Sequence, residues 1–486
     1  MNDSSPALKI GKRTFITAVA ILALLMLAAG ILTQAIPAGS YERIAADGRE
    51  TIDPGSFRYM PKVDYPAWRW LTAPVEVLAG PDGPMVLVII FFILFIAAGF
   101  ALLEKSGVMA AMISKIVKRF EKRKYMLLSV IVLFFMLMGA VLGTFEENIA
   151  LVPIIIALAY YLGWDSLVGL GMSILASCFG FAAAISNPFS IAITQRISDL
   201  PLYSGTGFRI IVFLFFYLIV DLFLIRYARK IEKNPQLSLI YSEDAALRAK
   251  YSSGGFEDDV DGTVRRRMNR AMVCFLISVV LIFAAIIASS MVEGLSDLIM
   301  PIIGVVFLAG SIAASCIAGM KAKSGWNVVF KGISGMAPGI VLILMAMSVK
   351  FIISNGGIMD TILYKAASVI SGTSPYAAAF MIYILVLALE LFIGSSSAKA
   401  FLIMPIIAPL SDLIGVTRQT TVLAFCFGDG FSNVLYPTNP VLLICLGLTV
   451  VSYPRWFKWT IKIQLLTFAA SCAFLAAAVA LKLGPF

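Results

Sequence analysis

Long apolar runs separated by short polar segments extend along almost the whole chain. About 18 or more consecutive apolar residues are enough for a helix to cross the hydrocarbon core of a bilayer. Apolar runs lie near 14–36, 84–103, 125–143, 149–162, 165–195, 208–228, 271–293, 297–320, 337–354, 376–394, 400–414, 417–449 and 460–482. The pattern predicts an all-α polytopic membrane protein that retains the run at 14–36 as its first span.

Composition supports a membrane protein and excludes several kinds of chemistry. Of the 486 residues, 60% are hydrophobic and 14% are charged, and the net charge is +10. The chain has no histidine, which excludes Ser-His-Asp hydrolysis and HExxH metal sites, and its six cysteines have neither zinc-ligand nor disulfide spacing. The sequence contains no ATP-binding P-loop, which argues against a primary pump. We expect no enzyme activity, no nucleic-acid partner, and no cofactor other than H⁺ or Na⁺ as a coupling ion.

Basic residues indicate which loops face the cytoplasm. Lys and Arg cluster in four segments, at 104–124, 226–270, 321–331 and 455–462. Cytoplasmic loops of membrane proteins carry an excess of Lys and Arg, so all four segments are placed in the cytoplasm. This assignment puts the N-terminus inside and the C-terminus outside, with the stretch 37–83 on the outer face.

The two halves of the chain match when one is shifted by 252 residues. GTFEENIALVPIIIALAYYLG (143–163) then lies over SSSAKAFLIMPIIAPLSDLIG (395–415), with a proline and a glycine in register. The same shift places the Asn-Pro at 187–188 on the Asn-Pro at 439–440. We interpret this match as an internal duplication.

The second copy is predicted to be inverted. Segment 104–124 is rich in basic residues, whereas its counterpart near 355–375 contains only Lys365. This predicts an inverted-repeat, elevator-type architecture with two re-entrant hairpins and two broken helices. The predicted division is a first repeat at 1–230 (spans near 14–36 and 84–103, hairpin 125–162, broken helix 165–195, span 208–228), a cytoplasmic linker at 231–270, an extra connecting span at 271–293, and a second repeat at 297–486 (hairpin 376–414, broken helix 417–449).

Each repeat contains a short apolar limb that follows a polar tip. The limbs at 149–162 and 400–414 are short for a span, and the tips before them lie at 144–148 and 395–399. A polar tip at membrane depth is tolerated only where protein or water lines it, which predicts a re-entrant hairpin. Asn is a good N-cap and Pro is favoured in the first helical turn, so each Asn-Pro is predicted to end one half-helix and begin another.

The tips and breaks predict a shared binding site near the middle of the bilayer. Helix N-termini offer partial positive charge and free N–H groups to a carboxylate, and carbonyl groups freed at the breaks suit a cation such as Na⁺. Antiparallel repeats with broken helices are typical of secondary transporters. The predicted substrate-binding residues are Thr144, Glu146, Glu147, Asn148, Ser186, Asn187, Pro188, Ser395, Ser396, Ser397, Lys399, Thr438, Asn439 and Pro440, and the predicted ion-coupling residues are Asp429 and Asn433.

Ionisable side chains inside the predicted spans leave two interpretations open. Glu147 and Lys399 occupy matching positions of the two repeats. Either they form a structural ion pair, or Glu146 or Glu147 meets a cationic group or a proton while Lys399 meets a carboxylate. The second arrangement would suit a zwitterionic substrate. Asp429 either lines the site or joins two helices through a hydrogen bond.

The motifs GTFEENIALVPI, GSSSAKAFLIMPI, SNPFSIAI and GDGFSNVLYPTNPVLL resemble those of the YfcC-like and anaerobic four-carbon-dicarboxylate carrier (DcuC-like) family, which is related to basic amino-acid antiporters. The resemblance covers nearly the whole chain. It implies a multi-pass homodimer in the bacterial cytoplasmic (inner) membrane that works by elevator-type alternating access. Related sodium/dicarboxylate symporters have Ser-Asn-Thr at their tips, whereas this chain has Glu146-Glu147 and three serines at 395–397. The substrate and the coupling ion therefore stay open.

We expect an ion-coupled symporter or exchanger of a small carboxylate-bearing solute, such as an amino acid, a short peptide or a dicarboxylate. An ion or solute channel is the alternative, although a channel needs a continuous polar path and polarity here is concentrated at the tips and breaks. An intramembrane aspartyl protease is a minor alternative, prompted by Phe427-Gly428-Asp429. That chemistry expects a glycine where Cys426 stands and a second aspartate after a tyrosine, which this sequence lacks.

Overall fold

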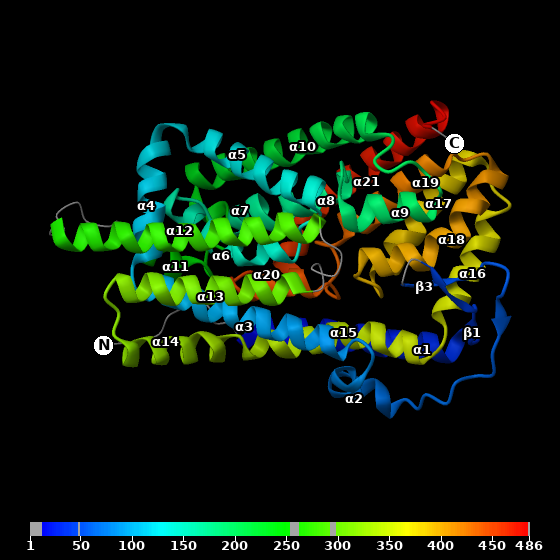
Figure 1. Ribbon diagram of the computed structural model, residues 1–486, viewed down its shortest axis with the longest axis horizontal. Coiled ribbons are helices and arrows are strands. Elements are labelled where there is room, and N and C mark those ends of the chain that lie inside the picture. The colour runs from blue at the N-terminus through cyan, green and yellow to red at the C-terminus, as the bar shows by residue number, and fades with distance from the viewer. Residues whose placement is uncertain (1–11, 47–48, 253–261, 292–297, 485–486) are drawn as a thin grey trace.

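The computed structural model (Figure 1) describes residues 12–46, 49–252, 262–291 and 298–484. Parts of the predicted first repeat, linker, connecting span and second repeat fall on residues 1–11, 47–48, 253–261, 292–297 and 485–486, which lie outside the described residues. Within the described residues, ten helices are long and apolar enough to cross a membrane: Phe15–Ala35, Gly83–Lys105, Lys124–Leu142, Ser166–Ile197, Thr206–Lys233, Gly262–Ser289, Ile299–Ile317, Ala322–Asn355, Ser396–Ile414 and Tyr453–Ala480. The chain is a helical, multi-pass membrane protein, as its apolar runs predict.

The elements of the first half of the chain follow the predicted apolar runs closely. Short 3-10 and π turns are labelled η. The elements are α1 (Lys12–Ala35), β1 (Gly39–Ser40), β2 (Arg43–Ala46), β3 (Arg49–Ile52), β4 (Arg58–Tyr59), α2 (Trp68–Glu76), η2 (Val77–Ala79), α3 (Gly83–Lys105), α4 (Val108–Phe120), η3 (Glu121–Arg123), α5 (Lys124–Leu137), η4 (Met138–Leu142), η5 (Glu147–Ala150), α6 (Val152–Tyr161), α7 (Ser166–Leu170), η6 (Gly171–Leu175), α8 (Ala176–Ala183), η7 (Pro188–Ala192), α9 (Ile193–Ile197) and α10 (Thr206–Lys233).

The second half is also helical and contains the second hairpin and the second break. Its elements are η8 (Pro235–Leu237), α11 (Ala245–Ser252), α12 (Gly262–Met291), α13 (Ile299–Ile317), α14 (Ala322–Gly335), α15 (Ala337–Asn355), α16 (Met359–Ile370), α17 (Pro375–Glu390), α18 (Ser396–Ile414), α19 (Arg418–Ser432), α20 (Pro440–Gly447) and α21 (Tyr453–Ala480). Helices α17 and α18 form the second hairpin, and α19 and α20 are the two parts of the broken helix.

Several short elements lie outside the predicted apolar runs. The basic segment 104–124 is mostly helix α4, which buries its apolar positions from Val108 to Ile113 while its later basic residues lie toward the surface. Strand β1 pairs antiparallel with β4 and strand β2 with β3, so two small sheets form in the stretch predicted to lie outside the membrane. These elements are too short or too polar to give a signal in a search for spans.

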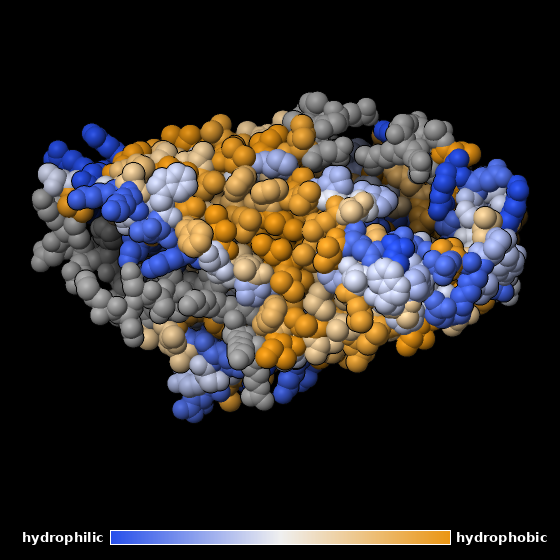
Figure 2. All heavy atoms as spheres, turned by 90° about the horizontal axis from the view of Figure 1, so that it is seen from below, coloured by the Kyte–Doolittle hydropathy of each residue, from blue (hydrophilic) through white to orange (hydrophobic). Residues whose placement is uncertain are grey.

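The long helices run side by side, and the two ends of the bundle differ in the elements that cover them (Figure 1). Helices α4 and α14 lie at one end, and α16 with strands β1 and β3 lies at the other. Figure 2 shows a hydrophobic band across the middle of the molecule with hydrophilic residues gathered toward both ends. Leu24, Leu214 and Val280 are among the large apolar side chains exposed on the outside of the bundle. This distribution is that of a protein surrounded by lipid.

Both Asn-Pro dipeptides stand at breaks between helical segments. Helix α8 ends at Ala183, Ala184 takes a left-handed conformation with φ of 45°, and η7 begins at Pro188. The Asn187 Oδ1 atom accepts hydrogen bonds from the N–H groups of Phe189 (2.8 Å) and Ser190 (3.3 Å). Such side-chain caps replace the hydrogen bonds that an interrupted helix loses at its start.

The second break has the same geometry. Helix α19 ends at Ser432 and α20 begins at Pro440. The Asn439 Oδ1 atom accepts hydrogen bonds from the N–H groups of Val441 (3.0 Å) and Leu442 (3.3 Å). The two Asn-Pro dipeptides are therefore equivalent in conformation as well as in sequence.

The first hairpin turns at a glycine that the neighbouring break requires. Helix α5 continues into the π turn η4, after which Gly143 adopts a φ of 70°. A Cβ atom on Gly143 would lie 2.2 Å from Oδ1 of Asn187. A residue with a side chain would thus be strained in conformation and would clash with the cap of the break. We call residues 143–150 the first tip and residues 391–397, between α17 and α18, the second tip.

Residues separated by 252 positions meet at the centre of the molecule. The Cys178 thiol donates a hydrogen bond to the carbonyl oxygen of Gly430, 3.0 Å away. The rings of Phe179 and Phe431 lie with their centroids 5.0 Å apart and tilted by 67°. Helices α8 and α19 approach closely there, because a Cβ atom on Gly430 would lie only 2.3 Å from Cα of Ala182. In an arrangement with two-fold symmetry, residues near the axis contact their own equivalents.

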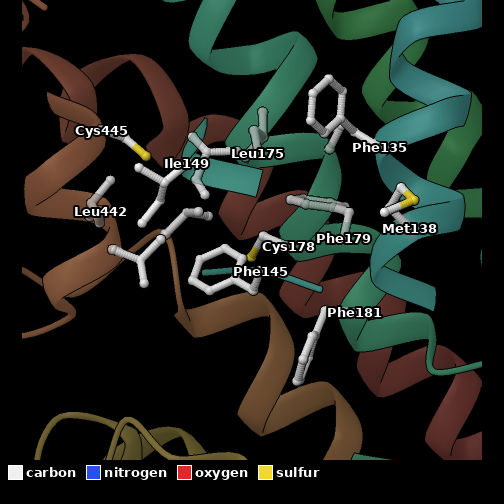
Figure 3. Close-up of a cluster of buried hydrophobic side chains, with 14 of the residues drawn as sticks. Phe135, Met138, Phe145, Ile149, Leu175, Cys178, Phe179, Phe181, Leu442 and Cys445 are labelled. Atoms are coloured by element: carbon white, nitrogen blue, oxygen red, sulfur yellow. The ribbon is translucent and has the colours of Figure 1, made fainter. Parts of the chain in front are cut away.

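Each tip packs on the half-helix that follows the break in the other half of the chain. Figure 3 shows the buried apolar cluster in which Ile149 of the first tip lies next to Leu442 and Cys445 of α20, with Phe145 beside Cys178 of α8. At the second tip, the Ser397 hydroxyl donates a hydrogen bond to the carbonyl oxygen of Phe189 in η7, at 3.2 Å. The two tips and the two breaks therefore form one continuous central region.

The segment that follows α10 is anchored by two buried aspartates. Asp165 accepts hydrogen bonds from Tyr227 Oη (2.8 Å) and Ser238 Oγ (2.7 Å). Asp244 is fully buried and accepts hydrogen bonds from the Tyr160 hydroxyl, from Ser166 Oγ (3.2 Å) and from Ser166 N (3.3 Å). Part of the predicted linker 231–270 is thus packed against the start of α7. Burial, together with the nearby charge of Asp165, raises the pKa of Asp244 to about 7.

Candidate functional site

A cavity of about 1160 Å³ lies between the two tips, the second break and the α3 and α15 helices. Strands β1 and β2 and the start of α16 complete its wall. Its volume suits a small solute with surrounding water, and the polar groups of both tips converge on it. Seven charged side chains line it, five acidic and two basic: Asp82, Glu146, Glu147, Asp360 and Glu390, with Arg43 and Lys350.

The first tip presents two carboxylates to the cavity. Glu146 and Glu147 both line the wall, and one oxygen of Glu147 accepts a hydrogen bond from the N–H of Phe145 at 3.1 Å. Among the described residues, no Lys or Arg nitrogen lies within 4.0 Å of either carboxylate. Buried carboxylates without a basic partner are costly unless they bind a proton or another cation.

The other residues predicted at the first tip point into the protein. The Asn148 side chain donates to the carbonyl oxygen of Thr144 (3.1 Å) and to the hydroxyl of Ser177 on α8 (2.8 Å). Thr144 and Asn148 are buried and do not line the cavity. These two residues fasten the tip to the broken helix behind it.

At the first break, Ser186, Asn187 and Pro188 lie behind the cavity wall, and their neighbour Phe189 lines it instead. The Ser186 hydroxyl donates to the carbonyl oxygen of Val141 at 3.3 Å. The Asn187 side chain caps η7 and faces Gly143 of the first tip. The first break therefore shapes the wall through its backbone rather than through these three side chains.

The second tip lines the cavity with three serines that have different partners. Ser395 caps α18 by accepting the N–H of Ala398 at 3.4 Å. Ser396 donates a hydrogen bond of 2.6 Å to Oδ2 of Asp429, and Ser397 donates to the first break as described above. Because Ser395 only accepts, its hydroxyl hydrogen is available to a molecule in the cavity.

Lys399 is completely buried and does not face the cavity. Its ammonium group lies between the carboxylates of Glu390, at the end of α17, and Asp429, on α19, with 2.8 Å to Oδ1 of Asp429. The structure thus pairs Lys399 with these two residues and not with Glu147, its equivalent in the first repeat. Glu390 lines the cavity, whereas Asp429 lies behind the wall. An acidic residue inside the apolar run 376–394 is the signal that singles out Glu390.

The second break lines the cavity with Asn433, Thr438, Asn439 and Pro440. The Asn439 amide donates to Oδ1 of Asn433 at 2.7 Å while its own oxygen caps α20. The Thr438 hydroxyl is buried and has no hydrogen-bond partner within the described part of the chain. The caps occupy N–H groups at the start of both half-helices, so at the two breaks the free donors to an anion come from hydroxyl groups.

Two ion pairs form another part of the cavity wall. Arg43 of β2 contacts both oxygens of Asp360 on α16 at 3.0 Å. Lys350 of α15 lies 2.8 Å from a carboxylate oxygen of Asp82, which precedes α3. Both basic residues on the wall therefore have acidic partners. Sequence reasoning missed Arg43, Asp82 and Asp360 because they lie outside the tips and breaks.

Ten apolar helices in the described part of the chain, together with a cavity whose charged residues are mostly acidic, define a multi-pass membrane protein with a site for a small polar solute. The profile of the DcuC family, described as C4-dicarboxylate anaerobic carrier, matches residues 15–480. The chain belongs to this family of membrane carriers.

Two sequence relatives and two solved structures are similar to the chain. "Putative basic amino acid antiporter YfcC" of Escherichia coli K12 is 30% identical over 461 residues, 88% of this chain and 89% of that protein. An uncharacterized protein of Haemophilus influenzae is 27% identical over 371 residues, which are 76% of this chain and 71% of that protein. The Alcanivorax borkumensis YdaH transporter is similar in structure, with a TM-score of 0.41 and 16% sequence identity over 97% of this chain and 100% of that one. Neisseria gonorrhoeae MtrF, described with a class of antimetabolite efflux pumps, is similar with a TM-score of 0.42 and 16% sequence identity over 95% of this chain and 94% of that one.

Proposed function

We propose that this protein is a secondary active transporter of a small solute that carries both a carboxylate and a cationic group, as a basic amino acid does. The observation behind the proposal is the charge of the cavity wall. Five acidic side chains face the cavity with two basic ones, and both basic side chains are already paired. A cationic group of the substrate would neutralise Glu146 and Glu147, for which the described residues offer no basic partner.

The hydroxyl groups across the cavity supply the other half of the recognition. Ser395 and Thr438 each have a hydroxyl hydrogen that the protein does not use. Both are suited to a substrate carboxylate, because a charged acceptor strengthens a hydrogen bond from a neutral donor. The name of the E. coli relative, which refers to basic amino acids, agrees with this choice of substrate.

A dicarboxylate is the second candidate, favoured by the description of the family profile. A dicarboxylate would bring two negative charges against an acidic wall whose basic residues are held by Asp82 and Asp360. Like charges in a site of low dielectric repel strongly. The charge balance therefore favours the amino acid.

Alternating access by an elevator-like movement is the proposed mechanism. Three features support inverted repeats: the matching Asn caps, the contacts between residues 252 apart, and the placement of the hairpins. The first hairpin contacts α4 and the second contacts α16, and these helices lie at opposite ends of the bundle (Figure 1). We propose that the scaffold includes α1, α3, α13 and α15, with the N-terminus in the cytoplasm of a bacterium and a homodimer as the working unit.

Counterflow in proteoliposomes tests the proposal. Vesicles loaded with L-arginine or L-lysine and diluted into the labelled amino acid are expected to accumulate label, whereas vesicles loaded with succinate and given labelled succinate are not. Glu147→Gln should lower basic amino-acid counterflow at least about tenfold, because it removes a carboxylate partner worth about 1.4 kcal/mol or more. Asp64→Asn, at an exposed position that is not part of the cavity wall, is the matched control and should leave counterflow unchanged.

Robust succinate counterflow with no response to basic amino acids would overturn the amino-acid proposal in favour of the dicarboxylate. Flux per protein far above the turnover of a carrier, with no counterflow, would instead indicate a channel.

A further inference from the structure

The cluster of Glu390, Lys399 and Asp429 holds three ionisable groups with almost no contact with solvent. The side chains of Lys399, Glu390 and Asp429 are 0%, 1% and 1% exposed. One ammonium and two carboxylates have a net charge of −1 when all three are ionised. Leaving an uncompensated charge in a buried site costs several kcal/mol, on the order of the penalty for breaking a buried ion pair. The cluster is therefore more stable when it carries one additional proton.

The ion-pair contacts of the cluster and its one side-chain hydrogen bond indicate which carboxylate carries that proton. Asp429 has a partner at each oxygen, Lys399 at Oδ1 (2.8 Å) and the Ser396 hydroxyl at Oδ2 (2.6 Å). Glu390 is paired only through Oε2, and its Oε1 has no hydrogen-bond partner among the described residues. Charged acceptors need more partners than neutral ones, so Asp429 is the better-supported carboxylate and Glu390 the better place for the proton.

Glu390 is also the member of the cluster that reaches the cavity. It lines the wall, as do Glu146 and Glu147, whereas Lys399 and Asp429 lie behind it. The Glu390 side chain is only 1% exposed and both of its carboxyl oxygens are buried, so a cation in the cavity acts on the carboxyl group through its electrostatic field rather than by direct contact. The electrostatic field of that cation favours the ionised form of Glu390, and the proton on Glu390 in turn disfavours binding of the cation.

We propose that Glu390 is the proton-coupling residue of the transporter and that its proton competes with a cationic substrate. This inference rests on the proposed function, since it names the coupling ion of the same site. When the substrate binds, the proton leaves Glu390 for water in the cavity, and Glu390 becomes a carboxylate next to the ammonium of Lys399. Charge is conserved because the positive group of the substrate takes the place of the proton. The coupling is exchange of substrate for H⁺.

A test of Glu390 has to distinguish its titration from that of the other titratable groups near the cluster. Glu146 lies close enough to Asp429 to interact with it electrostatically, and so does Cys178. The titratable groups on the same helix and on the elements around it include Tyr383 on α17, Lys399 on α18, Asp429 and Cys426 on α19, Asp360 on α16, Cys472 on α21, Cys178 on α8, and Glu146 and Glu147 on the first tip.

Infrared spectroscopy tests the proton without a substrate. The carbonyl stretch of a protonated carboxyl group is expected in the purified protein near neutral pH and should be lost on raising the pH. Because Asp244 and the two carboxyl groups of the first tip can also hold a proton near neutral pH, the test is the difference between the wild-type spectrum and that of Glu390→Gln, which should contain one carboxyl component. The difference between the wild type and the control Asp64→Asn should not contain it. A Glu390→Gln difference spectrum without a carboxyl component would overturn the assignment. Glutamine mimics the protonated acid, so this variant is expected to fold; Glu390→Asp, which should restore a titrating band, is a second check.

Addition of L-arginine to the same samples tests the coupling. About one proton per bound arginine should be released into a weakly buffered medium, and the dissociation constant should fall about tenfold per pH unit while Glu390 is protonated. In Glu390→Gln, release and the pH dependence should both disappear, and replacing Na⁺ by choline should change nothing in either protein. Arginine that binds without proton release would overturn the coupling, as would a requirement for Na⁺. If the infrared band behaves as expected but no amino acid binds, the coupling to a cationic amino acid fails together with the proposed function, while the protonated Glu390 is still supported.

Discussion

The buried Asp244 predicts that the segment after α10 is held more tightly at acidic pH. The folded structure raises the pKa of Asp244 from 3.8 to about 7, first through burial and then through the charge of Asp165. When the segment leaves its position, the pKa returns to its ordinary value, because water then surrounds the carboxyl group. Between these two values the packed state holds one proton more than the released state. Packing therefore weakens as the pH rises and is weakest above the higher pKa.

The size of the effect follows from the two pKa values. Each pH unit within the window changes the free energy by up to about 1.4 kcal/mol. Between a pH of about 5.5 and about 7.5 the free energy of release should fall by about 2 kcal/mol, which is a roughly 25-fold increase in the released population. Replacing Asp244 by Asn removes this titrating group and should make the pH dependence smaller; the remainder comes from Asp165, whose pKa is also raised by burial.

Hydrogen exchange measured by mass spectrometry on peptides that cover residues 239–249 provides the assay. Exchange rates corrected for their intrinsic pH dependence report the free energy of opening. Wild-type protein and Glu243→Gln, a change at the exposed neighbouring acidic residue, should both show the pH dependence. Equal protection of the wild-type segment at both pH values would refute the reasoning, and so would an unchanged pH dependence in Asp244→Asn.

Two further predictions concern the centre of the molecule. Gly430→Ala should destabilise the protein by about 1–3 kcal/mol, because the new Cβ would lie 2.3 Å from a backbone atom of α8. Gly372→Ala, where a Cβ would meet nothing within 4 Å, is the control, and equal melting temperatures for the two variants would contradict the close packing. Asn439→Ala should cost about 1 kcal/mol through loss of the cap on α20, and Asn439→Ser should recover part of it. Thermal unfolding of the purified proteins measures both, and a serine variant no better than alanine would argue against the capping role.

Much of the helical framework could be predicted from the sequence, since length and apolar composition decide which segments can cross a bilayer. The Asn-Pro dipeptides also predicted two breaks, because capping and the geometry of proline are local properties. Helix α4 was missed, since its basic residues mask the apolar positions that it buries. The stretch predicted as a solvated linker contains Asp244, whose burial depends on partners more than seventy residues away in sequence.

The tips and breaks suggested where the site lies but not how each side chain is used. A match between repeats placed Glu147 and Lys399 at equivalent positions, yet Lys399 is paired with Glu390 and Asp429. Equivalent positions in a repeat need not face each other, because only residues close to the symmetry axis meet. Phe179 and Phe431 do meet in this way. The acidic character of the cavity also depends on Asp82 and Asp360, which distant segments bring to the wall.

Each tip packs on the opposite half of the chain, so the structure of each half depends on the other. The first tip rests on α20, and the second tip is bonded to η7. Neither half can complete a site by itself, since each would lack the surface on which its own tip packs. Produced as two separate polypeptides, the halves would have to assemble with one another before either could hold a ligand.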